Sequence, residues 1–418
     1  MTESLPSPTG FQPSSVSELS RFLRENAETD RNSLLPVGGR TALHYGHPPA
    51  EPPLIVETAK LARTVDYPAR DMTVTVEAGM RIDELAELLR EESQQLPIDV
   101  SQSNRATVGG VVATNTSGPR RYGYGTLRDY VIGVSAVDAS GRSFKAGGRV
   151  VKNVAGYDLC KLMIGSLGTL SILTQLTLKL KPIPESQSLL WVEFPLFDAL
   201  EVALQSLQGT AVRPVVVDAL TPSAAAQTAA ETRADLTANG PVLIVGVEGG
   251  RRETDWQLET LTAELSSAQP RSICEVDGES AERVLRALTE FSVNAEEPLT
   301  FRSSMPPSQV VGFLQQANDA GIVVHAHAGN GIAAGHLPDD VTDASRAREL
   351  LSPLHRHVDR HGGGFTILNC NEDWKRDLPV FGTPPGAWAL MMQLKQQLDP
   401  HGLLNPGRLF GAGDKVTG

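Results

Sequence analysis

The sequence predicts an α+β fold that is divided into more than one domain. A length of 418 residues provides for two or three hydrophobic cores, and 40% hydrophobic with 21% charged residues is an ordinary globular composition. Helix-period and strand-period patterns are both present in the first half of the chain. In the second half, strand, helix, strand units indicate an antiparallel sheet with helices on one face.

The first helix is predicted to begin at Ser15. Ser15 and Glu18 have the spacing of a capping box, and Leu19 opens an apolar stripe at helical spacing. A short strand then leads into the glycine-rich loop LLPVGGRTALHYG at 34–46. The segments PPLIVET and MTVTVEAG predict strands, and an amphipathic helix is expected between residues 81 and 92.

The segment TVGGVVATNTSGPRRYGYG, residues 107–125, combines glycine with small residues and offers little bulky apolar surface to a core. Taken alone, it is either a long surface loop or a backbone that runs against something large and flat, with the polar groups of 114–117 available for hydrogen bonds. Next, VIGVSAVDASGRSF predicts a hairpin that turns at 139–142. GYDLCKLMIGSLGTLSILTQLTLKLKP then predicts a helix, a Gly-Ser-Leu-Gly turn and a strand.

A domain boundary is predicted at PESQS, residues 184–188, where prolines end this strand. Beyond it, helices are expected over DALEVALQSLQ, ETDWQLETLTAEL and residues 308–320, and the chain closes with a helix around Leu390 and the tail LDPHGLLNPGRLF. The predicted strands of this half are LLWVEFPL, RPVVVDAL, GPVLIVGVEG, SICEVDG, PLTFRSS and GIVVHAHA.

The charge balance argues against two classes of partner. The chain has 49 acidic and 37 basic residues and a formal net charge of −12, whereas nucleic acids and anionic membranes attract clustered Lys and Arg. No run reaches the roughly 18 apolar residues of a membrane helix, and the N-terminus lacks the pattern of a secretory leader. We therefore expect a cytoplasmic protein without direct membrane insertion.

The chain has only three cysteines, Cys160, Cys274 and Cys370, which are far apart in the sequence. This spacing excludes a disulfide framework and the cysteine set of an iron–sulfur cluster, so we expect buried free thiols. Any iron–sulfur electron chain must therefore be on another polypeptide.

The glycine loop has two interpretations. Its bare backbone is suited to a phosphate cradle, because successive N–H groups can converge on an anion, but glycine is also common in hairpins and surface loops. No G-x-G-x-x-G opens a helix after a strand, and GxxxxGK[ST] does not occur, which argues against a Rossmann or P-loop nucleotide enzyme.

Four motifs together resemble the vanillyl-alcohol-oxidase, or PCMH-type, family of FAD-binding flavoproteins: the glycine loop, TVGGVVATNTSG, GYDLCKLMIGSLGTLSILTQLTLKLKP and LDPHGLLNPGRLF. The resemblance spans residues 14 to 185 and the last 20. VVKNVAGYDLCKLMIGSLGTLSILTQ and HAHAGNGI are most similar to the group of glycolate oxidase E subunits. The resemblance implies three parts: a PCMH-type FAD domain of two α+β subdomains at 1–185, an antiparallel, ferredoxin-like cap domain at 186–370, and a C-terminal segment at 371–418. This C-terminal return segment would pack back on the FAD domain.

The resemblance also implies a set of FAD-binding residues. The glycine loop would wrap the pyrophosphate, a second group would line the ribityl chain and isoalloxazine, and the strand after the Gly-Ser-Leu-Gly turn and the NPG motif would each contribute one residue. Relatives that tether the flavin use a histidine where this chain has Arg40, and His44 is expected to be a surface residue, so we expect noncovalent FAD. The implied residues are Val37, Gly38, Gly39, Arg40, Thr41, Ala42, Thr107, Gly109, Gly110, Ala113, Thr114, Ile172 and Asn405.

The metal-binding pattern of the 2-hydroxyacid dehydrogenases in this family, GHxGDGNxH followed by EHG, is not present. His327 matches its first histidine, but Ala334 stands at the second and His336 is displaced by two residues. His325 and His327 could share a strand face, yet the sequence shows no third ligand, so we expect a structural pair and no metal. Arg302, Lys375 and Arg408 are candidate anion binders, and no residue is assigned as a catalyst.

Three functions remain open at this stage. The leading hypothesis is the FAD-binding subunit of a glycolate oxidase complex, which would work with a paralogous catalytic flavoprotein subunit and an iron–sulfur subunit on a small 2-hydroxyacid, and reach the inner membrane only through those partners. The alternatives are a free-standing FAD-dependent oxidoreductase with another alcohol or hydroxyacid substrate, and a non-catalytic flavin-binding assembly subunit.

Overall fold

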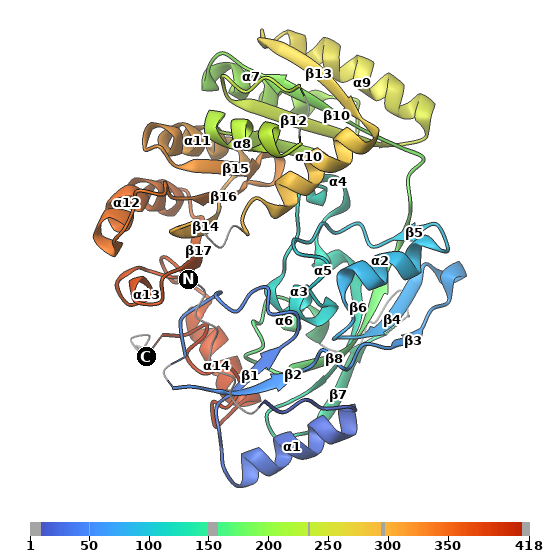
Figure 1. Ribbon diagram of the computed structural model, residues 1–418, viewed down its shortest axis with the longest axis vertical. Helices are drawn as coiled ribbons and strands as arrows, with labels where there is room; N and C mark the ends of the chain where they lie inside the picture. The colour runs from blue at the N-terminus through green and yellow to red at the C-terminus, as the bar shows by residue number, and fades with distance from the viewer. Residues whose placement is uncertain (1–9, 50, 149–157, 233–234, 294–296, 412–418) are drawn as a thin grey trace. The chain divides into compact units, whose positions relative to one another are not determined.

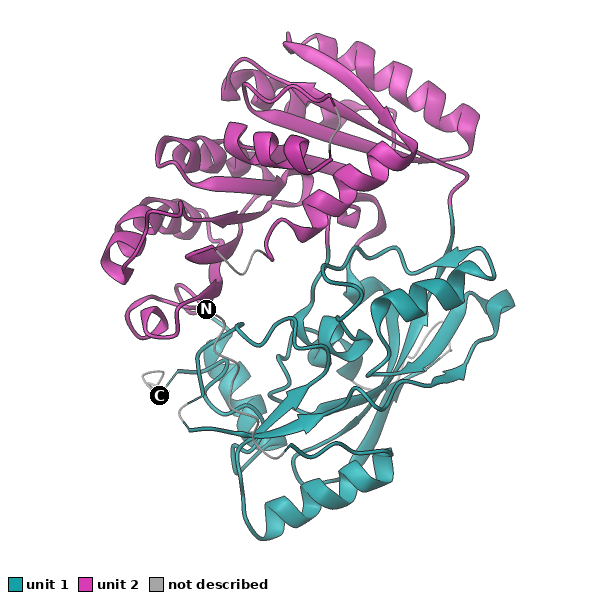
Figure 2. Cartoon of the chain, in the orientation of Figure 1, with its two compact units in different colours: residues 1–117, 126–183, 385–418 teal, residues 118–125, 184–384 magenta. Residues whose placement is uncertain are grey.

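The computed structural model describes residues 10–49, 51–148, 158–232, 235–293 and 297–411 (Figure 1). The chain forms two compact units (Figure 2). Unit 1 contains residues 1–117, 126–183 and 385–418, and unit 2 contains 118–125 and 184–384. Residues 371–384 thus belong to unit 2, whereas the sequence analysis grouped them with the return segment. The first residues of VVKNVAGYDLC, 150–157, lie outside the described part.

Unit 1 is built on two sheets and a short ribbon. A parallel pair joins β1 (Leu34–Val37) to β2 (Leu54–Glu57). The larger sheet has the order β3-β4-β8-β6-β7, and each pair in it is antiparallel. Its strands are β3 (Thr64–Asp66), β4 (Thr73–Glu77), β6 (Val131–Val137), β7 (Ser143–Gly147) and β8 (Ile172–Lys179), and the ribbon joins β5 (Gln94–Gln95) to β9 (Lys181–Pro182).

The helices of unit 1 follow the expected amphipathic segments. Ser15 caps α1 by accepting a hydrogen bond from the N–H of Glu18, while the Glu18 carboxylate accepts from Ser14 instead of closing the box on Ser15. The apolar side of α1 places Leu19 and Leu23 in the core. The helices are α1 (Val16–Glu28), η1 (Ala69–Asp71), α2 (Ile82–Arg90), α3 (Val108–Thr114), α5 (Leu127–Tyr130), α6 (Leu159–Met163) and α14 (Trp388–Leu398).

Unit 2 is an antiparallel sheet of eight strands in the order β13-β10-β12-β11-β15-β16-β14-β17. Each of its neighbouring pairs is antiparallel, as the sequence predicts for this half. The strands are β10 (Ser186–Glu193), β11 (Val216–Leu220), β12 (Val242–Gly249), β13 (Ser272–Asp277), β14 (Leu299–Ser304), β15 (Val323–His327), β16 (Ile332–His336) and β17 (Gly364–Cys370).

Helices pack on both faces of this sheet, so the expectation of one covered face was wrong. Leu190 and Val192 belong to the same apolar cluster as α7, α9, α11 and α12, whereas Leu189 and Trp191 pack with α8 and α10. The reason is the continuous apolar run in β10, which buries alternate residues on opposite faces. The helices are α4 (Arg121–Tyr124), α7 (Phe197–Ser206), η2 (Leu207–Gly209), α8 (Pro222–Thr232), α9 (Arg251–Ser266), α10 (Gly278–Glu290), η3 (Pro307–Gln309), α11 (Val310–Asp319), η4 (Ala328–Asn330), α12 (Ala344–Arg360) and α13 (Trp374–Asp377).

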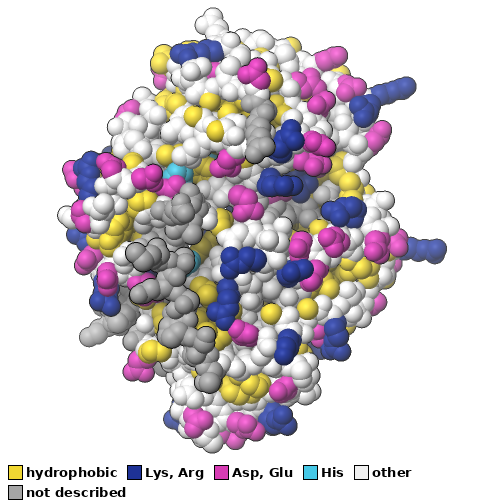
Figure 3. All heavy atoms as spheres, viewed as in Figure 1, with side chains coloured by type: hydrophobic (Ala, Val, Ile, Leu, Met, Phe, Trp, Pro, Cys, Tyr) yellow, Lys and Arg dark blue, Asp and Glu magenta, His cyan; other side chains and the backbone are white. Residues whose placement is uncertain are grey.

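The surface charge and the helix composition bear on possible partners of the protein. On the face shown in Figure 3, Lys and Arg side chains of the described residues are interspersed with Asp and Glu side chains. In the described ranges, no helix is both long enough and apolar enough to cross a membrane.

Candidate functional site

The glycine loop after β1 packs closely against the segment that precedes α3. A Cβ at Gly38 would lie 2.1 Å from Oγ1 of Thr107, and one at Gly39 would lie 1.8 Å from the carbonyl oxygen of Arg105. Both positions therefore require glycine, and the reason is contact with protein atoms as well as any approach by a ligand. Arg40 follows in the left-handed region with φ 58°, and its guanidinium pairs with Glu57 of β2.

The backbone N–H groups of residues 38–42 have no hydrogen-bond acceptor among the described residues. Such a run of unpaired N–H groups at a left-handed turn forms a concave anion-binding nest. Leaving these donors unpaired is costly unless water or a ligand takes their hydrogen bonds. The loop thus has the chemistry of a phosphate cradle, and this is a property of its hydrogen bonding as well as of its glycine content.

One pocket of unit 1 brings together most of the residues that the resemblance implied. Twelve of the thirteen line it, and Thr107 is the exception. Their sequence separation is large, because β1, α3, β8 and the C-terminal return each contribute. The pocket is lined by Val37, Gly38, Gly39, Arg40, Thr41, Ala42, Gly109, Gly110, Ala113, Thr114, Ile172 and Asn405, together with neighbours that include Ala78, Leu167, Gly168 and Arg408.

Residues 108–114 form the helix α3, which the sequence did not lead us to predict, whereas the interpretation of a backbone that runs against something large and flat stays a prediction. Thr107 is buried and caps α3, because its hydroxyl accepts a hydrogen bond of 3.3 Å from the N–H of Gly110. The valines of α3 are buried, so the segment also supplies core.

The two glycines of α3 serve different contacts. A Cβ at Gly109 would lie 2.7 Å from the Cβ of Ala78, so this glycine allows the helix to pack against the residue that follows β4. A Cβ at Gly110 would meet only the Thr107 hydroxyl, at 3.2 Å, within 4 Å. Because Gly110 also lines the pocket, its open side is available to a ligand.

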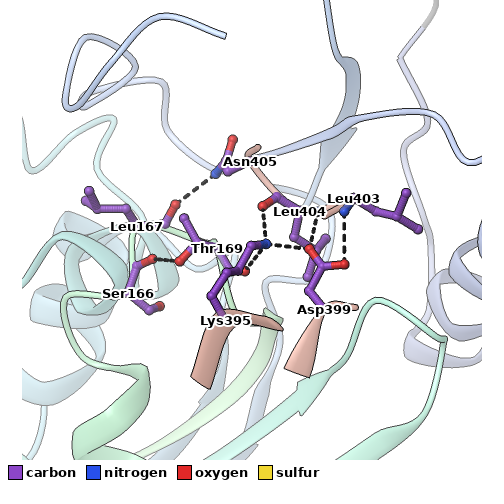
Figure 4. A network of polar contacts seen from close by, with 8 residues as sticks. All are labelled: Ser166, Leu167, Thr169, Lys395, Asp399, Leu403, Leu404 and Asn405. Atoms are coloured by element: carbon purple, nitrogen blue, oxygen red, sulfur yellow. Dashed lines mark hydrogen bonds and ion pairs between the residues drawn. The ribbon is translucent and has the colours of Figure 1, made fainter. Parts of the chain in front are cut away.

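A polar network fixes the C-terminal return beside the pocket (Figure 4). The Lys395 ammonium donates to the carbonyls of Thr169 and Leu404, at 2.7 and 2.8 Å, and pairs with Asp399. Asp399 is buried and accepts from the N–H groups of Leu403 and Leu404. Burial lowers the pKa of Lys395, and the Asp399 carboxylate opposes that shift.

Asn405 links the C-terminal return to two other segments that border the pocket. Its side-chain amide donates to the carbonyl of Leu167 at 2.8 Å, and its backbone N–H donates to Leu34 of β1 at 2.8 Å. The Gly-Ser-Leu-Gly turn, β1 and the tail are thereby held together around one pocket. Arg408, a candidate anion binder, also lines the pocket and donates to the carbonyl of Leu43.

A second group of polar residues lies on the sheet of unit 2. Asp218 of β11 accepts from Nε2 of His325 at 2.8 Å, and its two oxygens lie 3.0 and 3.1 Å from Nδ1 of His327. One potential ligand atom from each of the three residues lies within 4.8 Å of the others. The sequence analysis found no third ligand for the two histidines. The structure corrects this, because β11 and β15 are neighbours in the sheet although they are far apart in the chain.

The strand register explains how these side chains meet. His325 lies opposite Leu220 of β11 on one side and opposite Ala334 of β16 on the other. Ala334 in turn lies opposite Arg302 of β14. Directly opposed residues share a sheet face, so Asp218, both histidines and Arg302 project from the same face. The imidazole of His325 is thus next to the position where the family pattern has its second histidine.

Burial and neighbouring charges determine the protonation states of Asp218 and His325. Burial disfavours the charged form of Asp218, but the neighbouring His327 and His325 outweigh it and lower the pKa of this carboxyl. Burial lowers the pKa of His325, and the Asp218 carboxylate opposes the shift. The favoured state at neutral pH is an ionised Asp218 beside a neutral His325.

Arg121 of α4 is a residue that the sequence analysis did not single out. Its Nε is buried without a hydrogen-bond partner among the described residues. Burial lowers the pKa of Arg121, the charge of Arg302 lowers it further, and Asp218 acts in the opposite direction. Arg121 thus lies close enough to Arg302 for their charges to interact, and two neighbouring guanidinium groups suit an anion. The sequence feature that could have indicated Arg121 is Arg-Arg-Tyr-Gly, residues 120–123, near the end of the segment 107–125.

The remaining candidates do not join this group. His336 is buried on β16 and pairs with Glu297, at 3.2 Å. Lys375 is buried on α13. The three cysteines are free, as predicted, although Cys274 is only partly buried, and burial raises the pKa of Cys370 to about 11.

Two protein-family models match this chain. Residues 10–147 match the FAD binding domain family, and residues 183–343 and 382–409 match the C-terminal domain of FAD linked oxidases. The chain thus combines the two domains that these family models describe, an FAD binding domain and the C-terminal domain of FAD linked oxidases. It is 28% identical to D-2-hydroxyglutarate dehydrogenase of Xanthomonas citri pv. viticola, over 97% of this chain and 89% of that protein.

Other relatives support the same family. Glycolate oxidase subunit GlcE of Escherichia coli is 26% identical, over 92% of this chain and 94% of that protein. Subunit GlcD of Bacillus subtilis is 25% identical, over 95% and 88%. p-Cresol methylhydroxylase with bound substrate has a similar fold, with a TM-score of 0.70, 15% identity and coverage of 95% of this chain and 87% of that one. The predicted PCMH-type fold is confirmed.

This FAD-linked oxidase is a flavoprotein oxidoreductase, and FAD is its cofactor. The pocket of unit 1 fits that cofactor on two observations. The unpaired N–H groups of residues 38–42 suit its phosphates, and the open side of Gly110 admits a flat ring. The contacts of individual pocket residues with FAD stay predictions.

Proposed function

We propose that this chain is the FAD-binding subunit of a complex that oxidises glycolate or a related 2-hydroxyacid to the 2-oxoacid and passes the electrons to an iron–sulfur subunit. The similarity to GlcE and GlcD, which are named as glycolate oxidase subunits, supports the complex. The named activities of the relatives, including D-2-hydroxyglutarate dehydrogenase, support the substrate class.

One observation is the main support for this proposal: the chain has a cofactor pocket but lacks the cysteines for an iron–sulfur cluster of its own. An iron–sulfur cluster takes four cysteine ligands, or two cysteines with two histidines in the Rieske type, and the three cysteines of this chain are isolated in the sequence. Electrons that reach FAD here need an acceptor outside these 418 residues. A partner with an iron–sulfur cluster, such as the resemblance implies, meets that need.

The residues of unit 1 would bind the cofactor without a covalent bond. The N–H groups of 38–42 would hold the pyrophosphate, and α3 with Ile172 would support the isoalloxazine. When bound, FAD supplies a two-electron acceptor for the C–H bond of the substrate. Arg40 stands where a tethering histidine would be, and its ion pair with Glu57 occupies its side chain.

The residues of unit 2 would bind the acid. Arg121 and Arg302 would hold the substrate carboxylate, because a paired guanidinium site neutralises that charge and fixes its orientation. This assignment also favours a second candidate function, a free-standing 2-hydroxyacid oxidoreductase, because the chain then has substrate-binding groups of its own.

The experiment adds hydroxyacids to the purified, FAD-loaded chain without oxygen and follows bleaching of the visible flavin band. We expect bleaching by glycolate, D-lactate or D-2-hydroxyglutarate, and at least a tenfold weaker apparent affinity in Arg302→Met. Arg346→Met is the control, because Arg346 is exposed and pairs only with Glu349. Equal bleaching by simple alcohols that lack a carboxylate would contradict the substrate class. Bleaching followed by rapid turnover with a quinone, without partners, would favour the free-standing enzyme.

A further inference from the structure

We propose that Glu248 is a positioning residue for the acid-binding groups of unit 2, because it holds the short helix α4 that carries Arg121. The inference rests on the proposed function, since it concerns how the acid is held and not which acid it is. The helix α4 spans only four residues. A helix of this length is not stable by itself, so its position depends on contacts with the rest of unit 2.

The Glu248 carboxylate contacts α4 at both of its ends. One oxygen accepts a hydrogen bond of 2.5 Å from the hydroxyl of Tyr124, the last residue of the helix, and the other pairs at 3.4 Å with the guanidinium of Arg120, which precedes the helix. The Glu248 side chain is only 1% exposed. A buried carboxylate is costly unless it is paired and hydrogen-bonded, so these two contacts are needed by Glu248 as well as by α4.

The backbone of α4 is also fitted closely to unit 2. The N–H of Gly123 donates to the carbonyl of Val215 at 3.1 Å, and a Cβ at Gly123 would lie 2.7 Å from the Cα of Val215. On the other side, a Cβ at Gly329 would lie 2.3 Å from the ring of Tyr122. Both glycines permit contacts that a side chain would prevent, so α4 has one defined place beside the start of β11.

The strand register places Glu248 on the same sheet face as Asp218. Asp218 of β11 lies opposite Ile244 of β12, and Glu248 follows Ile244 on β12 by an even number of residues. Directly opposed residues project from the same face, and so do residues at even spacing along one strand. Arg121 is near enough to Asp218 for their charges to interact. The helix therefore connects a fixed point at Glu248 to the acid-binding groups on one face of the sheet.

The surroundings of Arg121 do not favour its charged side chain. Its Nε is buried without a hydrogen-bond partner among the described residues. Burial lowers the pKa of Arg121, and the charge of Arg302 lowers it further, while Asp218 acts in the opposite direction. A guanidinium in such a place has to be held there by the element that carries it until an acid pairs with it. The contacts of Glu248 with α4 serve this purpose.

The test compares the parent with Glu248→Gln and Tyr124→Phe, each loaded with FAD. Hydrogen exchange measures how firmly residues 118–125 are held, and anaerobic stopped-flow bleaching of the flavin band gives an apparent Kd and a limiting rate of reduction. The probe is whichever of glycolate, D-lactate and D-2-hydroxyglutarate bleaches the parent best. In Glu248→Gln we expect exchange at 118–125 to be about tenfold faster or more. The Kd should rise about tenfold or more, as for loss of a hydrogen bond to a charged group, with the limiting rate little changed.

Tyr124→Phe removes one of the two contacts and keeps the ring, so both effects should appear with smaller size. It also keeps the proposal testable if Glu248→Gln does not fold. Glu193→Gln is the matched control, because Glu193 is a carboxylate of the same sheet whose side chain is 2% exposed and pairs with Arg271 instead of α4. It should keep the parental exchange at 118–125 and the parental Kd. Equal changes in Glu193→Gln, or unchanged exchange at 118–125 in Glu248→Gln, would overturn the proposal.

Arg121→Met distinguishes failure of this inference from failure of the proposed function. If Arg121→Met weakens acid binding and Glu248→Gln does not, the positioning role of Glu248 is wrong and the acid-binding groups stand. If Arg121→Met binds the acid as well as the parent does, or if none of the three acids bleaches the parent, the acid-binding role in the proposed function is wrong and this inference fails with it. Weaker binding in both variants, with faster exchange at 118–125 in Glu248→Gln alone, is the expected result.

Discussion

At the scale of single residues, the pocket depends on glycines that are needed for different reasons. Gly39 has no room for a side chain, because the carbonyl of Arg105 occupies the place of a Cβ. Gly110 has room, and the space beside it belongs to the pocket. The first glycine shapes the loop, and the second leaves space for what the loop and helix bind. A side chain at Gly39 should therefore disturb folding, whereas a side chain at Gly110 should mainly disturb ligand binding.

We predict that Gly110→Val lowers retained FAD by at least tenfold while thermal stability of the cofactor-free protein changes little. Its Cβ meets only the Thr107 hydroxyl at 3.2 Å, and the added methyl groups extend into the pocket. Gly39→Val should lower both FAD content and stability, because its side chain overlaps the backbone. The measurements are flavin absorbance after gel filtration and thermal unfolding.

The control for this pair is Gly386→Val, at a position of unit 1 with no atom within 4 Å of the added Cβ. It should leave FAD content unchanged. Full FAD occupancy in Gly110→Val would show that the pocket is not the flavin site.

At the scale of elements, the end of strand β4 in the unit 1 sheet is fixed by a buried polar contact as well as by apolar packing. Glu77 at the end of β4 has a side chain only 1% exposed, and it accepts from the N–H and guanidinium of Arg63. Burial disfavours its charge, but the Arg63 contacts prevail and lower the pKa of Glu77. The strand end is therefore stabilised by an ionised carboxylate.

The sign of the pH dependence follows. Because the folded pKa of Glu77 lies below its unfolded value, the contribution is complete above the unfolded pKa and is lost as the pH falls through the folded one. We predict that Glu77→Gln destabilises the protein at neutral pH by about 1 to 3 kcal/mol. The difference from the parent should shrink in acid, as measured by urea unfolding over a pH series.

Glu84→Gln is the matched control, because Glu84 pairs with Arg81 on the exposed side of α2. A surface pair of this kind contributes about 0 to 1 kcal/mol. If the two variants show the same dependence on pH, the buried contact of Glu77 is not the cause.

The elements themselves were predictable where one physical signal dominated. Ser15 and the stripe that begins at Leu19 located α1, and alternating residues located β8. The segment at 107–114 was not recognised as a helix, because glycine and β-branched valine have low helix propensity. Its formation depends on the Thr107 cap and on burial of the valines, which are tertiary effects. The second layer of helices was missed although the continuous apolar run in β10 is typical of a strand that is covered on both faces.

At the scale of the whole molecule, the two groups of functional residues differ in how far the sequence could reveal them. The glycine loop is a local motif, and its resemblance to a known family led to the other pocket residues. Arg121, Asp218 and His325 come from segments separated by about a hundred residues each, and only the strand register unites Asp218 with the histidines. No local pattern marks Asp218, which lies within an apolar strand.

The last prediction concerns the complex. Electrons that arrive at the flavin need an acceptor, and with three isolated cysteines this chain cannot hold an iron–sulfur cluster that would take them. We predict that co-expression with a paralogous flavoprotein and an iron–sulfur protein gives an assembly with at least one copy of each. Because the formal charge of −12 provides little basic surface, association should depend on complementary protein contacts and should persist in moderate salt. Gel filtration and native mass spectrometry of the co-expressed proteins measure it.

The decisive comparison is activity with and without the partners. Glycolate oxidation with a quinone or dye acceptor should be at least tenfold faster for the assembly than for the chain alone, because the iron–sulfur subunit would carry electrons from FAD to the acceptor. Gly110→Val should assemble normally but lose this gain, which separates assembly from flavin function. If the chain elutes alone in the presence of both partners and reduces a quinone by itself, it works as a free-standing oxidoreductase, and the acid-binding role proposed for Arg121 and Arg302 then applies to that enzyme.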